Sequence, residues 1–184
     1  MRNIDWNMVE ETKEFESLKP GGYVAVIKNA EDNPDKEYLK ISYDIYEGKF
    51  KNYYENLYKA KQFWGGNFYR SYKESARGFF KAFLNAVKQS NVGFVFNNDE
   101  TNLRNKLVGI VLSEEEYVGN DGTVKTRLYV STVTNVENIK KGNFAVKRKK
   151  KLAEYALNDN SDQFFANNGF SVNDNQIDIG DDPF

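Results

Sequence analysis

The sequence contains no cysteine and no histidine among its 184 residues. Without thiolate or imidazole groups, the chain has no disulfide, no cysteine or histidine zinc site, no Cys or Ser-His nucleophile and no histidine acid-base chemistry. The longest apolar run covers residues 107–112 and includes a glycine, whereas roughly 18 apolar residues are needed to span a bilayer. We therefore expect a cytoplasmic protein without a cofactor, which binds a ligand or uses carboxylate, lysine, tyrosine or hydroxyl chemistry.

Charge is unevenly distributed along the chain, although the formal net charge is only -1. Residues 152–184 contain seven acidic residues and no Lys or Arg, which leaves 26 basic against 20 acidic residues in 1–151. A basic body followed by an acidic tail is typical of a protein that binds a polyanion and uses the tail for a separate purpose. The same pattern also serves solubility alone, and charge does not separate the two interpretations.

The spacing of apolar residues predicts three strands, one helix and then two strands. Alternation marks the strands, and a Gly-Asn-Asp-Gly turn joins the last two in a hairpin. An apolar stripe of helical spacing predicts the helix at 73–89. The predicted strands are 23–29, 38–46, 50–57, 106–118 and 124–136. The helical stripe consists of Ala76, Phe79, Phe80, Phe83, Leu84 and Val87.

This order of elements is that of an OB-fold, a five-stranded, partly open barrel whose loops and one sheet face bind oligonucleotides. Other α+β folds share the order. We predict a mainly β protein with an OB-like barrel at 20–140 and one helix between strands 3 and 4. Residues 1–19 form a polar lead-in and 141–157 a basic connector. Residues 158–184 are rich in Asn, Asp, Gln and Ser, and this composition predicts a disordered acidic tail.

Residues 46–72 combine ten aromatic residues with five basic residues and only two acidic ones. Single strands of nucleic acid expose base faces and phosphates together, and proteins bind them with aromatic platforms and nearby cations. We predict that Phe50, Phe63 and Phe68 belong to the core and that the other rings contact bases, with burial of the tyrosines as the alternative. The Gly-Gly pair after Trp64 indicates a flexible loop tip. The predicted nucleic-acid-binding residues here are Tyr46, Lys49, Lys51, Tyr53, Tyr54, Tyr58, Lys61, Trp64, Tyr69 and Arg70.

A second group, Lys125, Arg127 and Tyr129, alternates along one predicted strand and therefore shares one face. This face either binds nucleic acid or is an ordinary solvated face of an antiparallel sheet. In the OB-like arrangement it would border the same groove as residues 46–72. The basic run 147–151 either attracts phosphates or rests against the acidic tail.

Clustered carboxylates at Glu114, Glu115 and Glu116 suit a magnesium ion in a nuclease. However, three consecutive residues of a strand cannot all face one site, because side chains alternate between the two faces. No other Asp or Glu motif in the sequence supports a metal centre. A solvated strand end is the preferred interpretation, and we predict no catalytic or metal site.

The sequence ends in Asp181, Asp182, Pro183 and Phe184, which resembles the acidic tip of bacterial single-stranded DNA-binding proteins. Those tips carry an apolar residue before the proline, and this chain lacks it. Such a segment suits a partner pocket in which an apolar cavity takes the ring and a basic rim attracts the acids. The resemblance implies that these four residues recruit replication or recombination proteins.

The body of the chain resembles a family of small proteins encoded by tailed phages of Gram-positive bacteria. The resemblance lies in YLKISYDI at 38–45, GKFK at 48–51 and LRNKLVG at 103–109, and it covers residues 20–137. It implies a non-enzymatic single-stranded DNA-binding protein of phage DNA replication or recombination, acting in the host cytoplasm, and a homo-oligomer is compatible with it. The alternatives are a protein-interaction factor that occupies host tip-binding pockets without binding DNA, and a metal-dependent nuclease.

Overall fold

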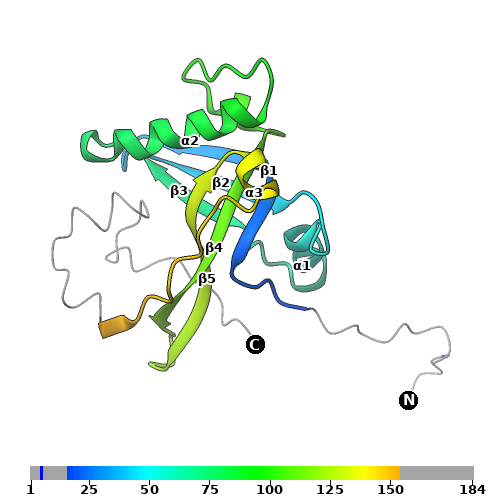
Figure 1. The fold of residues 1–184 in the computed structure, drawn as a ribbon. Helices are drawn as coiled ribbons and strands as arrows, with labels where there is room; N and C mark the ends of the chain where they lie inside the picture. Colours follow the sequence, from blue (N-terminus) through cyan, green and yellow to red (C-terminus); the bar gives the residue numbers. More distant parts are fainter. Residues whose placement is uncertain (1–4, 6–15, 154–184) are drawn as a thin grey trace.

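The computed structural model describes residue 5 and residues 16–153 of the chain. Its centre is a five-stranded antiparallel sheet with the strand order β3-β2-β1-β4-β5 (Figure 1). No helix within these residues is long and apolar enough to cross a membrane. The strands are β1 (Gly21–Asn33), β2 (Tyr38–Ile45), β3 (Asn67–Ser71), β4 (Leu107–Val118) and β5 (Val124–Thr134).

The sheet is OB-like but is not closed into a barrel, because its edge strands β3 and β5 do not pair with each other. Helix α2 (Arg77–Ser90) connects β3 to β4 and contacts β3, β4 and β5 (Figure 1). It therefore packs across the open side of the sheet. The prediction of a mainly β protein with five strands and one helix between the third and fourth is confirmed.

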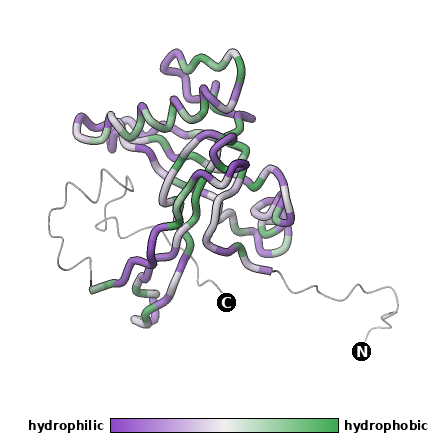
Figure 2. Tube along the Cα trace, in the orientation of Figure 1, coloured by the Kyte–Doolittle hydropathy of each residue, from purple (hydrophilic) through white to green (hydrophobic). Residues whose placement is uncertain are grey.

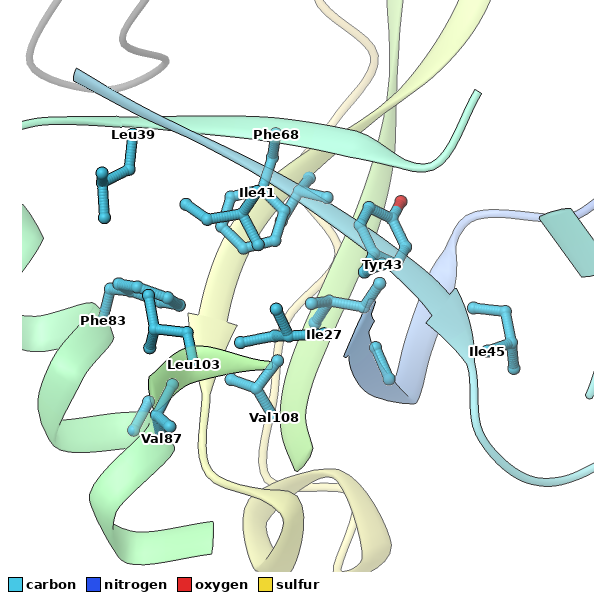
Figure 3. Packing of buried hydrophobic residues seen from close by; sticks show 14 of the residues in the cluster. Ile27, Leu39, Ile41, Tyr43, Ile45, Phe68, Phe83, Val87, Leu103 and Val108 are labelled. Atoms are coloured by element: carbon cyan, nitrogen blue, oxygen red, sulfur yellow. The ribbon is translucent and has the colours of Figure 1, made fainter. Parts of the chain in front are cut away.

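The core lies between the inner face of the sheet and α2. Alternate residues of β2, from Leu39 to Ile45, are buried as predicted. Phe83 and Val87 of α2 point toward the strand residues in Figure 3 and are themselves buried. Figure 2 shows hydrophobic residues along the middle of the sheet, whereas hydrophilic and hydrophobic residues alternate toward the far end of the β4-β5 hairpin. The hydrophobic pattern thus fixes which face of each strand is inner.

The predicted strand at 50–57 is wrong, because helix α1 (Tyr53–Lys61) begins there and the third strand is β3. The carboxylate of Asp44, which is 0% exposed, explains the difference. It accepts hydrogen bonds from the backbone N–H groups of Tyr54 (2.9 Å) and Glu55 (3.0 Å) in the first turn of α1. These N–H groups have no partner within a helix, so a carboxylate from the neighbouring strand takes the role of a cap.

Helix α2 ends within one residue of the predicted position, but one residue of the predicted apolar stripe, Phe79, does not face the core. Phe79 is 50% exposed, whereas Phe83 is buried and Phe80 is half-buried. Successive residues of a helix differ by about 100° in direction, so Phe79 and Phe80 do not face the same way. Phe80 packs edge-on against Phe83. Phe79 instead lies beside the opening between β3 and β5.

Helix α3 (Val136–Lys140) and the chain after it cover the outer face of β1 and β4. Two glycines allow this close approach. A Cβ atom at Gly22 would lie 2.5 Å from the ring of Phe144, and one at Gly109 would lie 2.5 Å from the Ile139 side chain. The outer face is therefore covered at its centre, and its accessible parts are the flanks formed by β2 with β3 and by the hairpin of β4 with β5 (Figure 1).

Candidate nucleic-acid interface

The predicted nucleic-acid-binding residues lie on α1 and the turn before it, and on three further surfaces. We call the first the aromatic strip, on the outer face of β2 and β3 beside α1. The second is the hairpin face, on β4 and β5 beyond the end of β1. The third is the seam, the opening between β3 and β5 next to α2. The expectation of a single groove is wrong, because α3 and the chain after it cover the outer face between the first two surfaces.

The register of β2 and β3 places the members of the aromatic strip in one row. Lys40 is paired with Tyr69 and Ser42 with Asn67, so these side chains share the outer face. Asn67 Nδ2 donates a hydrogen bond to the Trp64 carbonyl (3.0 Å), and Ser42 Oγ donates to Asn67 Oδ1 (2.7 Å). The strip consists of Trp64, Asn67, Ser42, Tyr69, Lys40 and Tyr38, whose ring meets that of Tyr69 edge to face at 5.4 Å between centroids.

Rings from α1 hold Trp64 at one end of the strip. The centroid of its ring lies 6.3 Å from that of Tyr54 and 6.4 Å from that of Tyr58. Trp64 is half-buried, while Tyr58 is 46% exposed and Phe63 is 42% exposed. The prediction that Phe63 belongs to the core is therefore wrong, whereas Phe68 is buried as expected. Exposed aromatic surface thus extends from the strip onto α1.

Two other tyrosines of this region are less available than predicted. Tyr54 cannot stack on a base because it is only 8% exposed. Its hydroxyl lies 3.3 Å from that of Tyr43, and burial raises the pKa of both hydroxyls well above the ordinary value of 10. Tyr53 is half-buried, with its ring edge-on to those of Phe50 and Tyr54. Phe50 packs against the core, in agreement with its prediction.

The loop that carries Trp64 is closely packed at Gly66, where the sequence indicated a flexible tip. Gly66 is buried, and a Cβ atom there would lie 2.6 Å from the ring of Tyr54 and would collide with the backbone carbonyl of Tyr43. Helix α1 ends at Lys61, and the next residue, Gln62, has a left-handed φ of 55°, so the chain turns there and Phe63 faces outward. This glycine is needed for close approach and not for motion.

Cations lie before and at the end of α1. Lys51 and Lys61 are exposed, as is the ring of Tyr46 at 43%. Lys49 forms an ion pair with Glu16 at 2.5 Å. An exposed ion pair contributes at most about 1 kcal/mol, so a phosphate can replace the carboxylate at little cost. The predicted lysines can therefore contact a polyanion that follows α1.

On the hairpin face, the predicted cations already have partners. Arg127 Nε donates to Glu115 Oε1 at 2.9 Å, and the guanidinium lies 5.0 Å from the centroid of the Tyr117 ring. Lys125 Nζ lies 3.3 Å from a carboxylate oxygen of Asp121. The Glu115 carboxylate is buried, so a phosphate would not replace it as easily as it would replace an exposed carboxylate such as that of Asp121. The hairpin face therefore resembles a solvated sheet face more than a phosphate-binding surface.

Tyr129 is covered on one side by Lys150, whose ammonium lies 4.6 Å from the centroid of its ring. Within the described residues, the Tyr129 hydroxyl is buried without a hydrogen-bond partner. Burial, with the nearby Glu115 carboxylate, raises its pKa to about 12. The prediction that Tyr129 stacks on a base conflicts with this cover.

The basic run 147–151 lies along the edge of β4, which neither interpretation of the sequence foresaw. The backbone N–H of Lys150 donates to the Glu114 carbonyl (3.0 Å), and its carbonyl accepts from the N–H of Glu116 (2.9 Å). Strand β1 pairs with β4 only as far as Leu112, so the edge beyond that residue accommodates this segment. The run thus extends the sheet by one short parallel segment.

The three consecutive glutamates do not converge on one point. Glu115 is buried and paired with Arg127, whereas the Glu116 carboxylate lies 3.4 Å from Lys149 and accepts a hydrogen bond from the N–H of Leu152. In the part of the chain that the structure describes, no three acidic, His or Cys side chains are grouped so that they could hold a metal ion. The magnesium interpretation has no structural support there.

Arg70 does not share a face with Tyr69, although the two are adjacent in sequence. It is paired with Leu39, and its guanidinium lies 4.9 Å from the centroid of the Phe68 ring, both on the inner face. Because the sheet is open, this inner position borders solvent at the seam. Arg70 lines a hollow of about 130 Å³ there, together with Phe79, Ala82, Phe83, Thr132 and Val133.

The predicted partner-binding residues Asp181, Asp182, Pro183 and Phe184 lie outside the described residues, as do the rest of 158–184 and most of 1–19. No protein-family model and no curated protein matches this sequence. The resemblance to phage proteins therefore stays a prediction.

Sequence reasoning missed four of the six residues of the aromatic strip. Tyr38, Lys40, Ser42 and Asn67 were not among the predicted binding residues. A usable signal existed, because alternation along 38–46 already places the first three on the face opposite the core. Combining that alternation with the sheet face that OB-folds use would have selected them.

Proposed function

We propose that the protein binds single-stranded DNA with little sequence preference and belongs to the phage-encoded kind that its sequence resembles. The observation that carries the proposal is the aromatic strip on the outer face of an OB-like sheet. A duplex hides its base faces within the stack, whereas a single strand exposes them to rings such as Trp64 and Tyr69. Each stacked base contributes about 1 to 3 kcal/mol, and stacking tolerates any base.

Lysines near the strip supply the contacts to phosphate. Lys40 lies within the strip, with Glu31 3.8 Å away, while Lys51 precedes α1 and Lys61 is its last residue. Cation contacts release counterions from the strand, so the affinity should fall as salt rises, with a slope of about -0.7 per phosphate contacted. The 26 basic against 20 acidic residues of 1–151 favour such binding at long range.

In this role the protein coats single strands during phage replication or recombination and protects them from hairpin formation and nucleases. The segment 181–184 then recruits partner enzymes, because its acids and its aromatic ring suit a basic-rimmed apolar pocket. The two functions use different parts of the chain, so each can be removed separately.

A fluorescence-anisotropy titration with a fluorescent oligo-dT strand of about 20 nucleotides, longer than one OB-fold's usual site of about 4 to 16 nucleotides, tests this proposal. Trp64→Ala and Tyr69→Ala should each weaken binding about fivefold to a hundredfold while leaving the salt slope unchanged. Val92→Ala, at a fully exposed apolar residue in the loop after α2, is the control and should bind normally. If the wild type fails to bind the strand even at low salt, the proposal is wrong and the protein-interaction alternative gains weight.

A further inference from the structure

Arg70 is a half-buried cation for which the described residues supply no counterion. Its Nη1 donates to the Tyr69 carbonyl at 2.9 Å, and within the described residues it has no carboxylate partner. Burial lowers its pKa to about 10, so the guanidinium stays protonated at neutral pH. By contrast, Lys49 and Lys140, which line the larger hollow between β1 and α3, have carboxylates at 2.5 and 3.4 Å.

A half-buried cation without an opposite charge destabilises a fold, and the Phe68 ring 4.9 Å away offsets only part of the desolvation cost. A guanidinium presents five N–H donors in a planar fork that matches phosphate or carboxylate oxygens. One of these donors in Arg70 is used by the hydrogen bond to the Tyr69 carbonyl. The remaining donors suit an anionic ligand that enters the seam.

The second feature of the seam is an aromatic ring that faces solvent. Phe79 is 50% exposed and lines the same hollow of about 130 Å³ as Arg70. An exposed phenylalanine beside a cation matches a ligand that carries a planar apolar group next to a negative charge. A nucleotide has both, because its base can stack on the ring while its phosphate meets the guanidinium.

The position of β3 connects the seam to the aromatic strip. β3 is an edge strand, and its Tyr69 and Arg70 are adjacent residues on opposite faces. Because the two side chains leave the edge strand on opposite faces, a polymer that passes around the edge of β3 can contact both. A free nucleotide would not use this continuity, and the planar base beside a phosphate fits Phe79 and Arg70 better than a peptide does, which favours a single strand as the occupant.

We propose that the seam between β3 and β5 is a second subsite for single-stranded DNA, in which Arg70 binds a phosphate and Phe79 stacks on a base after the strand has crossed the edge of β3. This inference rests on the function proposed above and adds a path for the strand. The strand would bend around β3 and would not run along the outer face alone.

Arg70→Met and Phe79→Ala test the subsite in the anisotropy titration with the oligo-dT strand. Each should weaken binding about tenfold, and only Arg70→Met should also reduce the salt slope, by about 0.7. Lys88→Ala is the matched control, because it removes an exposed charge from α2, the helix that carries Phe79. Its affinity should change little. Unchanged affinity of both seam variants, with a wild type that binds, would overturn the subsite and leave the proposed function intact.

Thermal unfolding distinguishes a binding role of Arg70 from a structural one. Because Arg70→Met removes an unpaired charge and keeps an apolar stem over Phe68, its Tm should equal or exceed that of the wild type. A Tm that falls in parallel with the affinity would instead assign a structural role to Arg70 and overturn the subsite.

A further experiment applies if the wild type does not bind the strand. Thymidine 5′-monophosphate is then titrated while the arginine Nε resonances are observed by NMR. A shift of the Arg70 resonance, absent in Arg70→Met, would retain the seam as a nucleotide site although the proposed function had failed, and no shift would overturn both. A shift caused only by a synthetic peptide of residues 174–184 would identify an acidic peptide as the occupant and also overturn the proposal.

Discussion

Replacing Asp44 by alanine removes the carboxylate that joins β2 to the start of α1. The side chain is 0% exposed and accepts three backbone N–H bonds, from Ile45 (2.8 Å), Tyr54 (2.9 Å) and Glu55 (3.0 Å). Loss of a helix cap costs about 0.5 to 2 kcal/mol, and a buried N–H left without a partner costs about 1 to 3 kcal/mol. We therefore expect Asp44→Ala to lower the free energy of unfolding by about 3 to 4 kcal/mol.

In a domain of this size, 1 kcal/mol corresponds to about 2 to 4 °C in Tm, so the expected decrease is roughly 6 to 16 °C. Circular dichroism during thermal and urea unfolding measures it. Asp44→Asn should be milder, because one amide oxygen can still accept from Ile45 and Tyr54 while only the bond from Glu55 is lost. The control is Asp35→Asn, at an exposed carboxylate in the turn between β1 and β2, and its Tm should be unchanged.

Asp44→Ala should also affect the candidate interface, because the rings of Tyr54 and Tyr58 in α1 pack against Trp64 of the aromatic strip. Tryptophan emission of Asp44→Ala should shift to longer wavelength before the sheet unfolds, and affinity for the oligo-dT strand should fall with it. If Asp44→Ala unfolds at the same temperature and urea concentration as the wild type, the bonds to α1 do not stabilise the fold and the argument is refuted.

Three further predictions concern pH, loop packing and the acidic tail. Burial raises the pKa of the Tyr43 and Tyr54 hydroxyls above 10, so the stability that they provide is complete below pH 10 and is lost as pH rises through their folded pKa values. Tyr43→Phe should reduce this pH dependence. Urea midpoints of the wild type that stay constant up to pH 11 would contradict the prediction. Gly66→Ala should lower the free energy of unfolding by about 1 to 3 kcal/mol, because the added methyl group overpacks against Tyr54. Gly65→Ala should unfold at nearly the wild-type urea concentration, because its Cβ would meet only the exposed Phe63 ring at 3.1 Å and the Tyr54 ring edge at 3.4 Å. Deleting residues 158–184 should tighten strand binding, most visibly at low salt, because their acids compete with phosphate for the basic body; weaker binding after the deletion would mean that the tail belongs to the DNA site.

The parts of the fold that the sequence predicted correctly depend on local periodicity. Alternation along β2 and across the β4-β5 turn places these strands, because one buried face forces every second residue to be apolar. Helix α2 is visible for the same reason. The segment 50–57 fails because its aromatic residues favour a strand, while the spacing of Tyr53 with Leu57 and of Tyr54 with Tyr58 equally fits a helix. The deciding contact comes from Asp44 on another element, so no local pattern contains it.

The candidate site was predictable in composition but not in arrangement, and the reason lies in β3. A window that counts rings and cations over 46–72 treats Tyr69 and Arg70 as neighbours, although adjacent residues of a strand face opposite sides. Only the pairing of β3 with β2, and the absence of a partner on its other edge among the described residues, determine what each side chain can reach. Tyr69 therefore joins Tyr38 and Lys40 from a strand more than 20 residues earlier, whereas Arg70 joins Phe79 of the following helix. An open sheet edge thus turns one stretch of sequence into two surfaces, which a single strand could connect by crossing that edge.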